Sequence, residues 1–142
     1  MKKIFISILL TISGSCLLSQ NLTIEFDNIR NNKGVVYVTL YETEHTWLDE
    51  DIEDYQFIFS KENVSNNKLT VLIDSLKPGY YGIAILDDED EDSEMRNNFI
   101  GFPKEGFGFS RNVKVRFVKP KFKECVLEIK NDTTINISIQ YK

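Results

Sequence analysis

The chain has 142 residues, 42% of them hydrophobic and 27% charged, which is enough for one domain but not for two with separate cores. Its 17 Lys and Arg residues against 22 Asp and Glu residues give a net charge of −5, so the basic surface that nucleic-acid binding requires is not expected. With seven Gly and three Pro, the composition also excludes a fibrous or disordered chain. A single acidic globular domain remains.

Residues 1–20 have the pattern of a secretory signal peptide. Two lysines precede the apolar run Ile4–Ile12, which is too short to span a membrane, and small residues follow it. We therefore expect an exported protein, periplasmic or secreted to the cell surface, with one domain over residues 21–142 and no membrane span. A lipid anchor at Cys16 is the alternative, but Ser13 stands where lipoprotein signals have a large apolar residue, so we favour ordinary export.

Downstream of the leader, apolar residues recur at every second position, which is typical of β-strands with one face in a core. The alternation is clear over 22–26, 36–40, 69–73, 81–85, 127–129 and 135–141, and weaker over 55–59 and 113–117. Turn-forming residues separate these strands at 31–34, 66–67, 77–79 and 131–132, and the first of these segments predicts a hairpin.

These strands predict an all-β domain, namely an antiparallel β-sandwich of seven or eight strands. One helical turn is expected around Glu42–Glu53, where Trp47 and Leu48 would pack over one end of the domain.

The acidic loop, residues 87–94, consists of Asp and Glu at seven of its eight positions. Asp88, Asp90 and Asp92 have the spacing with which calcium loops place oxygens around one ion. The pattern is incomplete, because Ser93 stands where such loops have glycine and the final bidentate acid is missing. Two interpretations stay open: a calcium site at the three aspartates, and a solvated acidic loop.

The Phe-Gly segment, residues 97–112, contains four phenylalanines and three glycines. Phe102, Phe107 and Phe109 are candidates for contact with a protein or glycan partner if their rings are exposed. The alternative is a loop that folds its rings back over one end of the domain. We favour this second interpretation, because four exposed phenylalanines would lower solubility.

The sequence contains no nucleophile elbow, no phosphate-binding glycine loop and no His-rich metal cluster, so we expect a protein that is not an enzyme. The rival hypothesis is a hydrolase that uses a carboxylate of the acidic loop, with Arg96 or Arg111 as an anion clamp. A purely structural envelope protein is the third hypothesis. Cys125 lies in a strand-like run and is expected to be a small buried hydrophobe.

Three segments resemble DUF2141, a family of exported bacterial proteins of unknown function: Gly34–Tyr41, Leu76–Ala84 and Asn98–Ser110. The resemblance covers nearly the whole mature chain. It implies a seven-stranded prealbumin-like or immunoglobulin-like sandwich and no established activity. Where the family's acidic loop has a final acid this chain has Arg96, which weakens the expectation of calcium. We therefore expect an exported binding or accessory module of the cell envelope.

Overall fold

The computed structural model describes residues 19–49, 52–95, 103–115 and 118–142. The strands are β1 (Gln20–Asp27), β2 (Val35–Tyr41), β3 (Tyr55–Ser60), β4 (Leu69–Leu76), β5 (Gly79–Asp88), β6 (Gly106–Phe109), β7 (Leu127–Ile129) and β8 (Thr133–Ser138). Short helices occupy α1 (Glu44–Leu48), α2 (Phe122–Cys125) and the 3-10 turn η1 (Ser110–Asn112). Across these described ranges, no helix has the length and apolar character needed to cross a bilayer.

The leader prediction falls largely outside the described residues, and Cys16 lies there too. The first strand, β1, begins at Gln20, one residue before the expected start of the domain. Gln20 is already buried, because it pairs with Leu76 of β4.

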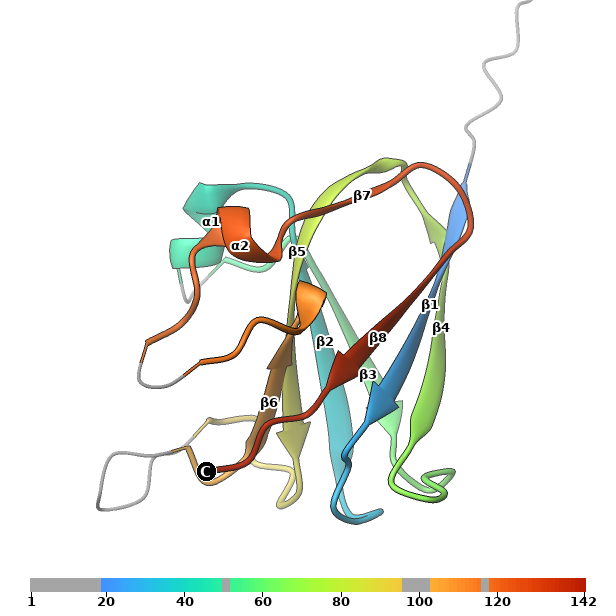
Figure 1. The fold of residues 1–142 in the computed structure, drawn as a ribbon, viewed down its shortest axis with the longest axis vertical. Helices are drawn as coiled ribbons and strands as arrows, with labels where there is room; N and C mark the ends of the chain where they lie inside the picture. The colour runs from blue at the N-terminus through green and yellow to red at the C-terminus, as the bar shows by residue number, and fades with distance from the viewer. Residues whose placement is uncertain (1–18, 50–51, 96–102, 116–117) are drawn as a thin grey trace, which may run out of the picture.

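Two sheets enclose one core, which confirms the all-β prediction (Figure 1). The three-stranded sheet has the order β4-β1-β8, and the five-stranded sheet has the order β3-β2-β5-β6 with β7 also paired to β5. The predicted alternation places the expected side chains inside: Leu22, Ile24, Phe26, Val36, Val38, Leu40, Leu69, Val71, Ile73, Tyr81, Ile83, Ile85, Ile129, Ile137 and Ile139.

The pairing is not antiparallel throughout, because β8 runs parallel to β1. The predicted hairpin at residues 31–34 is also wrong, since β1 and β2 lie in different sheets. The turns after β3, β4 and β7 likewise carry the chain from one sheet to the other. Turn residues reveal where the chain reverses, but contacts far away in sequence decide which sheet receives the next strand.

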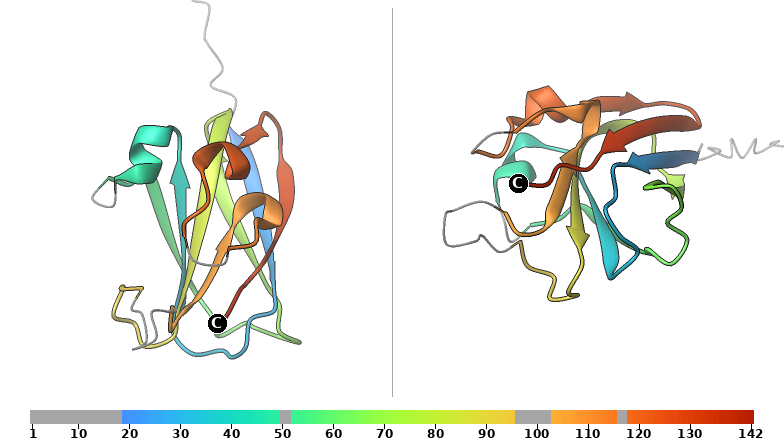
Figure 2. Two further views of the ribbon diagram at one scale, coloured as in Figure 1. Left: turned by 60° about the vertical axis from the view of Figure 1, so that its left-hand side comes forward. Right: turned by 60° about the horizontal axis from the view of Figure 1, so that its bottom comes forward.

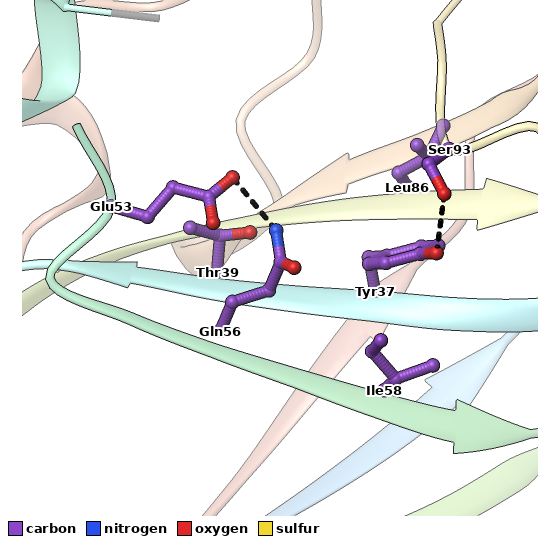
Figure 3. A pocket seen from close by; sticks show the side chains of 7 residues that line it. All are labelled: Tyr37, Thr39, Glu53, Gln56, Ile58, Leu86 and Ser93. Atoms are coloured by element: carbon purple, nitrogen blue, oxygen red, sulfur yellow. Dashed lines mark hydrogen bonds between the residues drawn. The ribbon is translucent and has the colours of Figure 1, made fainter. Parts of the chain in front are cut away.

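A second apolar cluster covers part of the outer face of the five-stranded sheet. It consists of Tyr41, Trp47, Phe107, Phe109 and Cys125. The helices α1 and α2 pack over this cluster, on the side of the sheet away from the main core, whereas the turn η1 lies mainly against β8 of the three-stranded sheet (Figure 2). Another part of the same face, around Tyr37 and Ile58, is open to the surface (Figure 3).

Near this second cluster the structure differs from the predicted elements in three ways. Trp47 packs into it as expected, but Leu48 is 72% exposed. Residues 113–115 form no strand, and the apolar side chains of Val113 and Val115 pack against the cluster instead. The predicted Phe-Gly loop contains β6, whose two phenylalanines face the cluster.

Candidate functional site

The acidic loop begins at the end of β5 with two aspartates that are both 0% exposed. Asp87 is held by the core: its Oδ1 lies 2.5 Å from Lys61 Nζ, and its Oδ2 accepts a 2.5 Å hydrogen bond from the Tyr141 hydroxyl. Burial raises the pKa of Tyr141, and the hydrogen bond to Asp87 raises it further. Asp87 therefore has a structural role and is not available to a ligand.

Asp88 organises the acidic loop around its carboxylate. Its Oδ1 accepts a hydrogen bond from the backbone N–H of Glu91, and its Oδ2 accepts one from the backbone N–H of Ser93, both at 2.8 Å. Glu91 and Ser93 adopt left-handed φ angles of 60° and 62°. When a calcium loop is counted from Asp88, Ser93 stands at the sixth position. Calcium loops use glycine there to make a tight turn. The loop thus has the required turn although it lacks that glycine.

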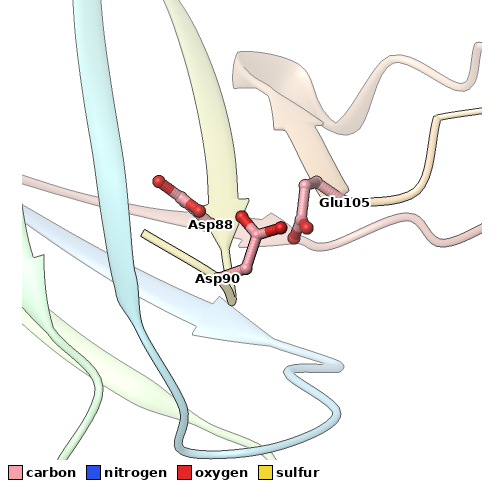
Figure 4. A group of neighbouring side chains, drawn as sticks. All are labelled: Asp88, Asp90 and Glu105. Atoms are coloured by element: carbon pink, nitrogen blue, oxygen red, sulfur yellow. The ribbon is translucent and has the colours of Figure 1, made fainter. Parts of the chain in front are cut away.

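Three carboxylates converge beside this turn. One carboxylate oxygen from each of Asp88, Asp90 and Glu105 lies within 4.8 Å of the others (Figure 4). Asp88 and Glu105 are buried, whereas Asp90 is exposed. We call these residues the acid trio.

The acid trio contains two of the three aspartates that the sequence predicts as ligands. Asp92 lies outside it, and the Oδ1 of Asp92 accepts a hydrogen bond from the Glu94 N–H within its own loop. Glu105 takes the third place, because β6 pairs antiparallel to β5 and sets Gly106 opposite Asp87. The alternation of Phe107 and Phe109 is the one sequence signal for that strand.

The acid trio has an excess of negative charge. Burial raises the pKa of Glu105, and the charges of Glu89, Asp90 and Asp88 raise it further, against one hydrogen bond from the Glu89 N–H. The nearby Arg30 forms its bidentate ion pair with Glu89, at 2.5 and 2.9 Å, and its charge interacts with Glu105 only at longer range. Burial alone would raise the pKa of Glu89, but the Arg30 interaction lowers it. Within the described residues, no ion pair reaches the acid trio.

Two of the three aromatic residues predicted to contact a partner are not at the surface. Phe107 and Phe109 are 4% and 8% exposed, because they form the second apolar cluster with Trp47. These two rings therefore present no contact surface in this structure. Phe102 and Arg96 lie outside the described residues.

The other reactive candidates lie far from the acid trio. Glu105 lies just before the first residue of β6, whereas Arg111 lies beyond its last residue. There Ser110 forms a hydrogen bond with Ile83 of β5. Asp88 lies five residue steps along β5 from Ile83, or roughly 16 Å of strand. Arg111 is thus not placed to clamp an anion at the acidic loop. Cys125 is buried, which raises the pKa of its thiol to about 11, so an inert side chain is expected.

Comparison with known proteins identifies a family. The model of the family described as "Uncharacterized protein conserved in bacteria (DUF2141)" matches residues 24–136. Neither a curated protein nor a solved structure matches the sequence. The matched region runs from β1 into β8 and includes both sheets and the acid trio. Because the match covers most of the sequence, the chain belongs to the DUF2141 family.

Proposed function

We propose that this chain is an exported, non-enzymatic binding or accessory module of the cell envelope, whose acidic end holds one calcium ion. The leader pattern of residues 1–20 supports export, and the two sheets around one core support a prealbumin-like or immunoglobulin-like sandwich. The convergence of Asp88, Asp90 and Glu105 is the observation that carries the calcium proposal.

Calcium suits this arrangement for chemical reasons. It binds carboxylate and carbonyl oxygens at 2.3–2.6 Å in flexible geometry, whereas Mg²⁺ demands a tighter octahedron and retains water. Two of the three carboxylates are already buried, so their ionised forms lack the solvation that water would provide. A bound divalent cation would replace that solvation and relieve the repulsion among the three groups. Waters and backbone oxygens would complete the coordination.

A thermal melt tests this proposal. The purified protein is melted first in excess chelator and then across a Ca²⁺ titration, with Mg²⁺ as the control cation. We expect saturable stabilisation by Ca²⁺ alone, of about 2.7 kcal/mol when Ca²⁺ reaches 100 times its dissociation constant. A flat response, or one that Mg²⁺ shares and salt abolishes, would mean a solvated acidic loop.

Two matched variants identify the ligands. Glu105→Gln removes a member of the acid trio and is expected to abolish the Ca²⁺ response. Asp92→Asn removes an acid of the same loop that lies outside the trio, and it is expected to retain most of the response. The reverse result would favour the three aspartates that the sequence pattern indicates.

A further inference from the structure

A hollow lies on the open part of the outer face of the five-stranded sheet, outside the second apolar cluster and beside the acidic loop. Its volume is about 410 Å³, within the range of small-molecule sites. Three neighbouring strands form its floor, with Tyr37 and Thr39 from β2, Gln56 and Ile58 from β3, and Leu86 from β5. Glu53, just before β3, and Ser93, in the acidic loop, also line it (Figure 3).

Part of the floor of the hollow is an apolar strip formed by Ile58, Tyr37 and Leu86. Ile58 is 57% exposed although it is a large aliphatic residue in a regular strand. The Tyr37 ring lies between the side chains of Ile58 and Leu86 (Figure 3). Such a strip offers contact to the carbon-bound hydrogens of a ligand.

The polar groups of the hollow are held at its two ends. At one end Gln56 Nε2 donates a 2.7 Å hydrogen bond to Glu53 Oε1, next to Thr39 (Figure 3). At the other end the hydroxyls of Tyr37 and Ser93 are hydrogen-bonded at 2.7 Å. These bonds fix the positions of carboxylate, amide and hydroxyl groups, each of which has further capacity to donate or accept. Fixed polar groups lower the entropy cost of binding a polar ligand.

The charge around the hollow restricts the ligand. Among the described residues its lining contains Glu53 and no Lys, Arg or His, and one end is formed by the acidic loop, so anionic ligands are disfavoured. An extended peptide that pairs with a sheet edge would bind along the outer edge of β3, beside the hollow and not on the sheet face that forms its floor. A sugar ring meets both requirements, because it has apolar C–H faces and uncharged hydroxyl groups around its edge.

We infer that this hollow binds a neutral oligosaccharide, whose ring faces rest on Ile58, Leu86 and Tyr37 while its hydroxyls bond to Glu53 and Gln56. This inference rests on the proposed binding function and names its ligand class. It moves the glycan contact from the phenylalanines of the Phe-Gly segment to the open sheet face.

An NMR titration of the purified protein tests the inference. The neutral probes are maltotriose, cellotriose, mannotriose, xylotriose and triacetylchitotriose, each raised to about 10 mM, which detects millimolar dissociation constants. Trilysine and trigalacturonate are the charged probes. We expect at least one neutral trisaccharide to give saturable shifts at the Ile58 and Leu86 methyls and the Gln56 side-chain amide, with none at Leu72.

Variants with a matched control localise the binding. Ile58→Ser and Gln56→Ala each change an exposed side chain of β3 and are expected to weaken binding at least tenfold. Leu72→Ser changes a residue that is 55% exposed on the outer face of the other sheet, and it is expected to leave binding unchanged. Melting curves of the three variants verify that each one folds.

Three outcomes would overturn the inference. They are the absence of saturable shifts with every neutral trisaccharide, binding of a charged probe alone, and equal weakening by Leu72→Ser. The calcium melt tests Asp88, Asp90 and Glu105, none of which lines the hollow, so failure of the calcium proposal can be told from failure of the sugar inference. Binding of trilysine alone at the hollow would reject an oligosaccharide ligand but would agree with the proposed binding function. A normal Ca²⁺ stabilisation with no probe bound would reject the oligosaccharide inference and leave the calcium proposal standing.

Discussion

Lys61 and Asp87 are both completely buried, and their side chains form an ion pair of 2.5 Å. Lys61 Nζ also donates a hydrogen bond to Asn31 Oδ1 at 3.2 Å, and Asp87 accepts one from Tyr141. Buried charges persist in proteins only when they are paired and hydrogen-bonded, and both conditions are met here. The pair links the segment after β3 to the end of β5, directly beneath the acidic loop.

Replacing one member of this pair tests its contribution. Lys61→Met would leave the Asp87 carboxylate buried without its counter-charge, and we expect the free energy of unfolding to fall by about 3–5 kcal/mol in urea denaturation. Lys130→Met breaks the exposed pair with Glu128 and is expected to leave stability almost unchanged. In the double variant Lys61→Met/Asp87→Leu, which buries no charge, much of the loss should be recovered. Similar losses for Lys61→Met and Lys130→Met would contradict this assignment.

Glu105 gives the protein a pH dependence when calcium is removed. Its pKa is raised in the folded state, so the folded protein binds a proton at Glu105 more tightly than the unfolded chain does. The stability from this proton is present below the ordinary glutamate pKa and is lost as the pH rises through the raised value. In chelator, Glu105→Gln should therefore melt above the parent at neutral pH. Melting curves from about pH 4 to pH 8 should show this gap closing toward acidic pH; a gap of opposite sign would refute the prediction.

At the scale of elements, β6 is a strand with two different faces. Phe107 and Phe109 belong to the second apolar cluster, whereas its glycines face the end of the chain. A Cβ on Gly106 would come within 2.7 Å of Ile139 and closer still to the Tyr141 ring. The absence of a side chain at Gly106 therefore lets the last residues pack directly on β6.

A methyl group at this position should loosen that packing. We expect Gly106→Ala to lower the free energy of unfolding by about 1–3 kcal/mol, as overpacking does in other cores. Gly79→Ala is the control, because the three atoms nearest to the added Cβ would all belong to the Tyr81 side chain, at 3.2 Å or more. Chemical denaturation of both variants measures the difference, and equal losses would mean that the residues after β8 adapt without cost.

At the scale of the whole molecule, the end of the chain joins the two sheets. The strand β8 pairs with β1 in the three-stranded sheet. Two residues later, Gln140 exchanges two backbone hydrogen bonds with Phe107 of β6 in the five-stranded sheet, at 2.7 and 3.0 Å. Tyr141 then bonds to Asp87 and stacks beneath Arg30, whose guanidinium lies 4.5 Å from the ring centroid. The base of the acidic loop is thereby tied to both sheets.

The local pattern of the sequence determines which residues are inside. Alternation with period two predicts the buried positions of β1, β2, β4 and β5, because successive side chains of a strand point to opposite faces. The same local signals identify the helical turn at Trp47 and the family to which the chain belongs. All of these depend on residues that are neighbours in the chain, so no knowledge of the fold is needed.

Tertiary structure alone decided how these elements meet. The parallel pairing of β8 with β1 depends on contacts more than a hundred residues apart, which no turn residue encodes. Phe107 and Phe109 are buried because α1 and α2 return to cover them, and Glu105 rather than Asp92 joins Asp88 because β6 pairs with β5. The sequence could indicate acidic and aromatic residues of the right kind, but their positions in space follow from strand pairing, which is a property of the whole chain.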